Sequence, residues 1–259
     1  MSWVVYSPSR DYILCRDQSL PNHQLERCIL KIVILVSAIA EWEAVKPLFP
    51  DAKIHQSPFG ESMDLILDTW HLTLFHSGWG KISSAAMMQY VIDHEAPDLI
   101  VNLGTCGGFD GVVDRGDVIL VEKTFVYDIV ELMGDLNISN YYASSLDLSW
   151  LPEPYPHPVR RGTIASADSD LPPEKIPLLK AHGAIAADWE SGALAWVANK
   201  NNARLLILRA VSDMVNEQSG EAYDNIELFN ERAATIMKRL IEQLPDWLNV
   251  VNLPDQNIH

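Results

Sequence analysis

The sequence predicts one three-layer α/β domain, with a central mixed, mostly parallel sheet flanked by helices. Three observations predict it. Short β-branched runs alternate with helical patterns from Lys31 onward, which is typical of strands joined by crossover helices. The first such run, "KIVILVS" (31–37), is apolar on both faces, as in a buried parallel strand. The chain has 259 residues, of which 48% are hydrophobic, and this suffices for a sizeable core.

Strands and helices then follow in order along the chain. The expected strands cover residues 31–37, 65–67, 72–76, 97–103, 116–129, 160–168, 183–190 and 204–213. The expected helices cover residues 40–49, 82–95, 191–202 and about 223–244. The helix at 82–95 should end there because Pro97 follows it. The strand that starts at Pro97 is expected to enter a glycine-rich turn, "GTCGG" (104–108).

Residues 1–30 precede this pattern, so we expect an N-terminal extension there and the α/β domain over 31–259. The longest apolar run, 29–40, contains Lys31 and is too short to cross a bilayer as a helix. Charged residues at positions 10, 11, 16 and 17 interrupt any apolar segment of a signal peptide. No membrane association is therefore expected.

The charge balance and the cysteines restrict the possible partners and location. Thirty-five acidic residues against nineteen basic ones give a net charge of −16, and such a surface repels nucleic acid and anionic lipid. The three cysteines, Cys15, Cys28 and Cys106, form no CxxC pair, which suits a reducing compartment. We expect a cytoplasmic protein that binds no nucleic acid.

Ligands of parallel α/β sheets bind at the carboxyl ends of the strands. The segments "VSAIAE", "GTCGG", "DWES" and "VSD" follow four of the expected strands. They contribute Glu41, Thr105, Glu190 and Asp213, three carboxylates and a hydroxyl. The sequence thus predicts a polar site at this edge of the sheet.

Two of these carboxylates also have simple structural interpretations. Asp213, preceded by Ser212, could cap a helix N-terminus, or it could be a carboxyl group whose pKa rises in a dry site so that it donates a proton. Glu190 could be a first-turn glutamate stabilised by the helix dipole, or it could accept hydrogen bonds from two neighbouring hydroxyl groups.

No HExxH or Cys/His cluster occurs, so no metal and no cofactor are expected.

Several motifs in the right order resemble the nucleoside phosphorylase and nucleosidase family, most closely its 5′-methylthioadenosine/S-adenosylhomocysteine nucleosidase branch. "KIVILVSAIAE" is similar to the opening strand of that family, "SGWGKISSA" to its G-x-G-K turn, and "VNLGTCGGF" to its N-x-G-[ST]-x-G-G segment. "DWESGALAWVANKNNARLLILRAVSD" resembles the M-E-[ST]-x-A helix and the R-A-[IV]-S-D strand. The resemblance covers about 31–244 and implies a nucleoside phosphorylase-like fold.

The resemblance also implies a role for each matching residue. Glu41 would activate the attacking water, with Glu43 as a less favoured substitute, and Asp213 would protonate the purine at N7. Glu190 would bind the ribose hydroxyls, and Thr105 would line the position of the water or phosphate. The implied substrate-binding residues are Glu190, Trp189, Thr105, Gly107, Ser212, Asp168 and Asp170.

Two positions differ from the family pattern. The segment "SADSD" has Asp170 where the family has an aromatic residue at the base pocket, which removes a stacking partner. Trp189 replaces the methionine that precedes the ribose glutamate. These differences leave the identity of the base and of the 5′ substituent open.

The expected reaction is hydrolysis of the N-glycosidic bond of a purine nucleoside. Phosphorylases of the superfamily have an arginine where this chain has Asn102, so water is expected as the nucleophile. A phosphate-dependent nucleoside phosphorylase and a non-catalytic nucleoside-binding protein on the same fold remain as alternatives. The resemblance further implies a homodimer in which the partner subunit completes the 5′ pocket.

Overall fold

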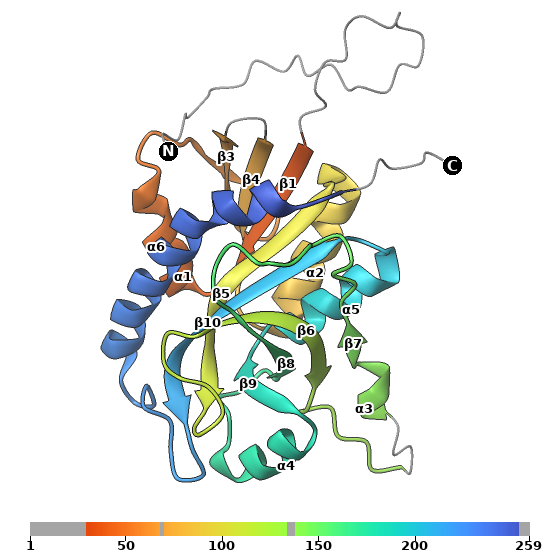
Figure 1. Ribbon diagram of the computed structural model, residues 1–259, viewed down its shortest axis with the longest axis vertical. Helices are drawn as coiled ribbons and strands as arrows, with labels where there is room; N and C mark the ends of the chain where they lie inside the picture. Colours follow the sequence, from red (N-terminus) through yellow and green to blue (C-terminus); the bar gives the residue numbers. More distant parts are fainter. Residues whose placement is uncertain (1–29, 68–69, 134–137, 254–259) are drawn as a thin grey trace, which may run out of the picture.

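The computed structural model describes residues 30–67, 70–133 and 138–253, and nearly all of the expected N-terminal extension lies outside them (Figure 1). The helices are α1 (Ile39–Val45), α2 (Gly80–Glu95), α3 (Ile138–Tyr141), α4 (Ile176–Ala181), α5 (Ser191–Asn201) and α6 (Ile226–Val250), with 3₁₀ turns η1 (Lys46–Leu48) and η2 (Pro173–Lys175). The strands are β1 (Leu30–Val36), β2 (Ile54–Gln56), β3 (Glu61–Leu67), β4 (Trp70–His76), β5 (Leu99–Phe109), β6 (Val118–Val126), β7 (Ser144–Ser145), β8 (Arg160–Ser166), β9 (Ala184–Asp188) and β10 (Leu205–Val215).

These strands form one mixed sheet, which confirms the expected fold class. Parallel pairings join β4, β1, β5 and β10 in that order, and also β6, β8 and β9. Antiparallel pairings build the β2–β3–β4 part and join β9 to β5 and β6 to β10. Because β10 pairs with both β6 and β5, the strands β5, β9, β8, β6 and β10 close into a ring. This closure depends on pairings between distant segments and was not predicted from the sequence.

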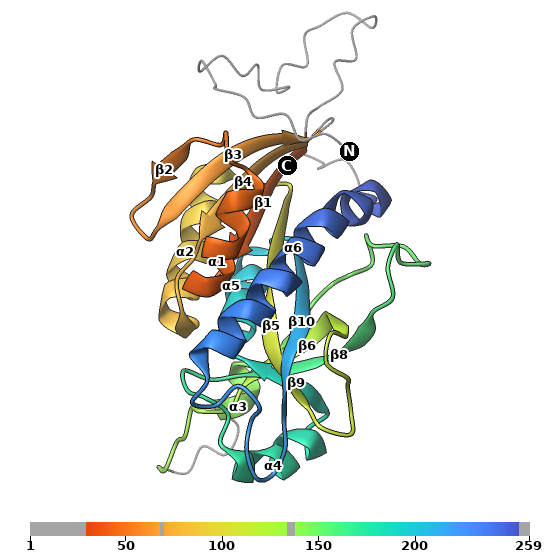
Figure 2. The same ribbon diagram turned by 90° about the vertical axis from the view of Figure 1, so that its left-hand side faces the viewer.

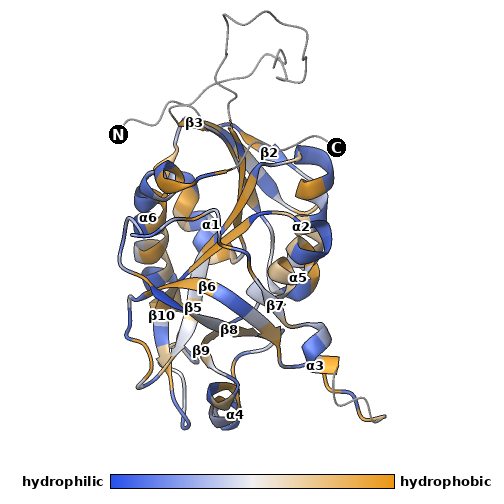
Figure 3. Cartoon of the chain, turned by 45° about the vertical axis from the view of Figure 1, so that its right-hand side comes forward, coloured by the Kyte–Doolittle hydropathy of each residue, from blue (hydrophilic) through white to orange (hydrophobic). Residues whose placement is uncertain are grey.

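Helices cover both faces of the sheet. Helices α1 and α6 contact each other on one face, and α2 and α5 contact each other on the other (Figures 1 and 2). Strand β1 shows the reason, since Ile32 and Ile34 belong to the core under α1 and α6, whereas Val33 and Leu35 pack with α2 and α5. Both faces of β1 are thus buried, as its continuous apolar sequence predicts. Figure 3 shows the central strands mostly hydrophobic and α6 alternating between hydrophobic and hydrophilic turns.

Helix α6 is longer than expected and starts later. Its N-cap is Asn225, whose side chain accepts a hydrogen bond from the backbone N–H of Leu228 at 3.1 Å. Residues between Ala233 and Leu248 are buried at helical spacing and fix this helix over β5 and β10. The helix continues through Pro245 to Val250, because its buried face still packs against the core there.

One sequence prediction about the strand ends is wrong, and one of the two alternatives for Asp213 is excluded. The "GTCGG" segment is no turn, because β5 runs through it to Phe109. A Cβ on Gly108 would lie 2.6 Å from Val211, so the glycine lets β10 pack closely on β5. Asp213 caps no helix, since it lies inside β10 next to a register shift between Val211 and Asp213. None of the helices in the described part of the chain has the length and apolar character of a membrane span.

Candidate active site

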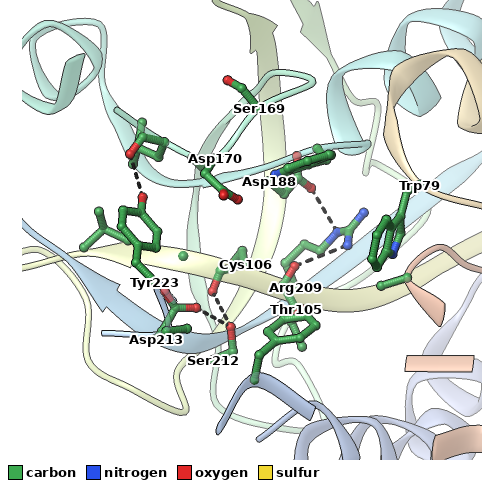
Figure 4. A pocket seen from close by; sticks show the side chains of 18 of the residues that line it. Trp79, Thr105, Cys106, Ser169, Asp170, Asp188, Arg209, Ser212, Asp213 and Tyr223 are labelled. Carbon is green, nitrogen blue, oxygen red and sulfur yellow. Dashed lines mark hydrogen bonds and ion pairs between the residues drawn. The ribbon is translucent and has the colours of Figure 1, made fainter. Parts of the chain in front are cut away.

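A cavity of about 630 Å³ lies along the second half of β5 and β10 (Figure 4). Its other walls come from the start of α1, the end of β9, the loop after β8 and the chain from Ala222 to Phe229. This volume lies in the range of small-molecule sites. The cavity therefore forms where the sequence predicted a site, although β5 continues past it to Phe109 and Val215, the last residue of β10, lines it.

Most of the residues predicted from the sequence line this cavity. They are Glu41, Thr105, Gly107, Asp170, Trp189, Glu190, Ser212 and Asp213. Asp168 is not among the residues that line it, because its carboxylate binds Lys81. Glu43 does not line it either, since its side chain is 59% exposed and pairs with Lys46. Of the two glutamates considered for activating water, only Glu41 therefore reaches the cavity.

Glu41 is buried at the start of α1 and is held by three donors. Its Oε1 accepts hydrogen bonds from the backbone N–H of Thr105 at 2.6 Å and from the Thr105 hydroxyl at 2.8 Å. Its Oε2 accepts the backbone N–H of Ala38 at 3.1 Å. Gly104 makes room for this arrangement, because a Cβ there would lie 3.0 Å from Glu41 Oε1 and 2.3 Å from Arg209 Nη1. The carboxylate thus has a fixed orientation at the cavity wall.

Arg209 is the buried cation of the site. Its Nε lies 3.1 Å from Asp188 Oδ2, and its Nη2 lies 3.3 Å from Glu190 Oε2. Its Nη1 donates to the carbonyl oxygen of Thr105 at 3.3 Å (Figure 4). The guanidinium is 1% exposed, so these contacts replace its hydration. One arginine thereby fixes two carboxylates and the strand that holds Glu41.

Asp188 and Glu190 flank the junction of β9 and α5. Asp188 accepts the hydroxyl of Ser166 at 2.6 Å and both the N–H and the hydroxyl of Ser191. Glu190 is positioned as the N-cap of α5 but makes no side-chain cap hydrogen bond, and its Oε1 instead accepts the N–H of Gly80 at 3.1 Å. Burial raises the pKa of Glu190, and the Arg209 guanidinium opposes that rise.

Asp213 lies further along the cavity, opposite Gly107 in the strand pairing. Its Oδ1 accepts the Ser212 hydroxyl at 2.7 Å, and the residue is 7% exposed. Burial raises the pKa of Asp213, while the Ser212 hydrogen bond and Arg232 oppose the rise. A raised pKa lets a carboxyl group keep its proton and act as an acid.

Polar and aromatic groups complete the two ends of the cavity. Near Asp213, Asp170 points toward the cavity, and Tyr223 donates from its hydroxyl to the Leu171 carbonyl at 2.6 Å (Figure 4). Burial, with the nearby Asp170 and Asp213, raises the pKa of Tyr223 to about 12. At the other end, the indole rings of Trp79 and Trp189 lie 6.4 Å apart.

Three further residues that line the cavity, Arg209, Asp188 and Tyr223, were not predicted from the sequence. A signal existed for Arg209, because an arginine inside the apolar run "LLILRAV" must be paired when the strand is buried. Asn102 does not line the cavity, since its amide donates to the Leu35 carbonyl within the sheet. Asn102 therefore does not determine the charge in the cavity, where Arg209 lies paired with Asp188 and Glu190.

Replacing Arg209 tests the buried charge cluster independently of any activity. In Arg209→Met, Asp188 and Glu190 lose their cation while buried, and the free energy of unfolding should fall by about 3–5 kcal/mol. Urea denaturation followed by circular dichroism measures this loss. The control Arg160→Met breaks a half-exposed pair with Asp117 and should cost far less. Equal losses in the two variants would contradict a tightly coupled cluster.

Within the described residues, no group of three or more His, Cys, Asp or Glu side chains is arranged to hold a metal ion. The side chains that line the cavity include carboxyl groups, the Arg209 guanidinium, hydroxyl groups and the Cys106 thiol. Such a set can donate a proton, accept a proton and bind a polyhydroxylated ligand.

Comparison with known proteins gives consistent matches. A sequence profile of the Phosphorylase superfamily matches residues 31–244. A 5′-methylthioadenosine/S-adenosylhomocysteine nucleosidase of Buchnera aphidicola subsp. Acyrthosiphon pisum is 28% identical over 193 residues, 67% of this chain and 81% of that protein. The apo structure of 5′-methylthioadenosine nucleosidase from Arabidopsis thaliana has a TM-score of 0.72 at 20% identity and covers 85% of this chain and 96% of its own. The nucleosidase of S. pneumoniae with the transition-state inhibitor MT-ImmA has a TM-score of 0.69 at 22% identity, covering 85% and 99%.

Proposed function

The chain belongs to the phosphorylase superfamily, and we propose that it hydrolyses the N-glycosidic bond of 5′-methylthioadenosine, S-adenosylhomocysteine or a related purine nucleoside. Relatives named as 5′-methylthioadenosine/S-adenosylhomocysteine nucleosidases support the substrate class. The observation that carries the proposal is the set of three carboxyl groups, Glu41, Glu190 and Asp213, that line one cavity.

The spacing of these groups suits the reaction. Glu41 is bound to Thr105, and Asp213 pairs with Gly107, so their anchor points are two residues apart on β5, about 6.6 Å along a strand. The two carboxyl groups are therefore anchored at different positions along the cavity, where one can act on the base and the other on water. Glu190 follows the end of β9, pairs with Arg209 of β10 and lines the same cavity.

Each carboxyl group then has a distinct role. Asp213, whose pKa is raised, gives its proton to N7 of the purine as the bond to the ribose breaks. Glu41 accepts a proton from the water that attacks the anomeric carbon. Glu190 lines the cavity and forms hydrogen bonds with the ribose hydroxyls.

Water is the proposed nucleophile because the cavity is acidic. Three carboxyl groups, Glu41, Asp188 and Glu190, lie around the single guanidinium of Arg209, so acidic groups outnumber the cation next to the reacting carbon. A phosphate dianion would be repelled there, whereas a neutral water is not. No cofactor takes part in this mechanism.

A panel of nucleosides tests the proposal. We expect free base from 5′-methylthioadenosine or S-adenosylhomocysteine, and adenosine, inosine and futalosine define the limits at the base and at the 5′ position. Asp170 and Trp189 line the cavity and differ from the family pattern, so the panel shows which base and which 5′ substituent this cavity accepts. Absence of base release from all five compounds would favour a non-catalytic nucleoside-binding protein instead.

The pH dependence of turnover should report on Asp213. Arg232 donates to the Ser212 carbonyl at 3.1 Å, and its charge lowers the pKa of Asp213. In Arg232→Gln, the pKa of Asp213 should rise further, so the acid stays protonated to higher pH. The alkaline limb of the profile of kcat against pH should therefore shift to higher pH. Arg239→Gln, on the same helix but bound to the Gly116 carbonyl, should leave that limb unchanged. A limb that moves to lower pH in Arg232→Gln would contradict the assignment of the acid.

A homodimer and a cytoplasmic role in methionine salvage belong to the same proposal. The chain after β6 exposes three apolar side chains, Val130, Leu132 and Met133, which are 68%, 91% and 95% exposed. They follow Tyr127, a lining residue of the cavity, so a partner subunit could cover them next to the site. Sedimentation equilibrium should give twice the chain mass of 29.0 kDa.

A further inference from the structure

Lys81, the lysine of the "SGWGK" segment, joins three parts of the chain that are distant in sequence. Its Nζ lies 2.5 Å from Asp128 Oδ2, in the segment after β6, and 3.0 Å from Asp168 Oδ2, in the loop after β8. The backbone N–H of Asp168 also donates to Asp128 Oδ2 at 2.9 Å. We call Lys81, Asp128 and Asp168 the lysine bridge. None of these three residues lines the cavity.

The lysine bridge is attached directly to Glu190 through the N-terminus of α2. The first two N–H groups of this helix go to carboxylates of other segments: Gly80 donates to Glu190 Oε1 at 3.1 Å, and Lys81 donates to Asp168 Oδ1 at 2.7 Å. These donors have no partner inside the helix. Trp79, at the N-cap, makes no side-chain cap hydrogen bond. The two carboxylates therefore take the place of an N-cap side chain.

Gly80 shows how closely these groups fit. Its φ of +80° lies in the left-handed region, and a Cβ there would lie 2.7 Å from Asp168 Oδ1. The carboxylate of Asp168 thus occupies the space that a side chain would take. A displacement of Asp168 would move the donor that orients Glu190.

Charge explains why the bridge needs a lysine. Asp128 and Asp168 are bound to each other through a backbone hydrogen bond, so their two carboxylates stay close together. The Lys81 side chain is 16% exposed, and those of Asp128 and Asp168 are 29% and 39% exposed, so water screens the two negative charges only in part. Without the ammonium group we expect the carboxylates to repel each other and the loop 167–171 to move away from α2.

We propose that the lysine bridge holds Glu190 and the loop 167–171 in the geometry that binds the ribose, with Lys81 as a positioning residue. This inference rests on the proposed function, in which Glu190 binds the ribose hydroxyls. The loop carries Ser169, Asp170 and Leu171, which line the cavity. Lys81 therefore acts on both the sugar and the base without contacting either.

The first test compares substrates with and without ribose hydroxyls in Lys81→Met. The value of kcat/KM for 5′-methylthioadenosine should fall by about 10-fold to 100-fold, because a misplaced Glu190 binds the hydroxyls poorly. For 2′,3′-dideoxy-5′-methylthioadenosine, which lacks the 2′ and 3′ hydroxyls, the fall should be far smaller. The control Lys31→Met breaks the pair with Glu95 at the other end of α2 and should change neither value. Equal losses on both substrates in Lys81→Met would overturn the proposal.

A second variant separates positioning from misfolding. In Lys81→Met combined with Asp128→Asn, the new amide can donate to Asp168 Oδ2 and removes one negative charge, so activity on 5′-methylthioadenosine should partly return. A structural defect caused by losing the lysine side chain would show no such return, and that result would overturn the proposal.

Hydrogen exchange gives a readout that needs no turnover. The amides of Gly80 and Lys81 and the loop 167–171 should exchange faster in Lys81→Met than in wild type, and not in Lys31→Met. Unchanged exchange would overturn the proposal even for an active enzyme. If the variant shows faster exchange but the wild-type protein hydrolyses no nucleoside, the lysine bridge is supported and the proposed function is rejected. The failure of the bridge and the failure of the function are therefore distinguishable.

Discussion

Asp213→Asn should lower kcat for 5′-methylthioadenosine by about 10²-fold to 10⁴-fold, the range for loss of a general acid. The amide keeps the shape of the side chain and can still accept the Ser212 hydroxyl, but it has no proton to give to the leaving purine. Release of adenine, followed by the change in absorbance, measures the loss. The effect should lie in kcat more than in KM, because proton transfer occurs in the transition state.

A loss of kcat in Asp213→Asn can be assigned to chemistry, because this substitution should not destabilise the fold. Burial raises the pKa of Asp213 in the folded protein, so above the unfolded pKa the ionised carboxylate costs stability that an amide does not. Asp213→Asn should therefore unfold at the same temperature as wild type or higher. Glu217→Gln, an exposed change in the loop after β10, is the control and should leave kcat unchanged. Hydrolysis by Asp213→Asn at the wild-type rate would reject Asp213 as the acid.

Glu41→Gln is expected to lower kcat by a similar factor, about 10²-fold to 10⁴-fold, since an amide cannot take a proton from water. Some stability should be lost as well. Both oxygens of Glu41 accept hydrogen bonds, from Thr105 and from Ala38, and the amide nitrogen would face one of these donors. An unpaired buried donor costs about 1–3 kcal/mol. Single-turnover assays on folded protein separate the chemical loss from this cost.

Glu43→Gln is the matched control, two residues away on the same helix. Its carboxylate is exposed and pairs with Lys46 at 2.7 Å, so kcat should stay within about twofold of wild type. The opposite pattern, with activity lost in Glu43→Gln and kept in Glu41→Gln, would assign the base to the other glutamate.

The alternation of elements was predictable because each element has a local signal. The apolar run of β1, the helical spacing of α2 before Pro97 and the paired strands β3 and β4 all occur near their expected positions. The rule that ligands bind at strand ends also located Glu41, Thr105, Glu190 and Asp213 in one cavity.

The length of β5 and β10 was not predictable from local signals. Glycines usually interrupt strands, and "GTCGG" therefore suggested a turn. In the fold, Gly104 and Gly108 make room for Arg209 and Val211 of the neighbouring strand, a reason that depends on tertiary packing. The closed ring of strands likewise depends on pairings between distant segments, such as β10 with both β5 and β6.

The contacts of the charged site residues were not predictable either, because their partners are distant in the sequence. Arg209 and Asp188 are 21 residues apart in the chain and meet only because β9 and β10 flank β5. Asp168 matched a family motif and was expected to bind substrate, but Lys81 takes its carboxylate. A motif match thus identified the position of Asp168, but only the tertiary structure shows that its carboxylate pairs with Lys81.

The most direct test of the central claim is the phosphate dependence of base release from 5′-methylthioadenosine. Hydrolysis by water in this acidic cavity predicts the same rate with and without phosphate, and a free reducing sugar as the second product. A rate that requires phosphate, together with a sugar 1-phosphate product, would contradict it and identify a phosphorylase.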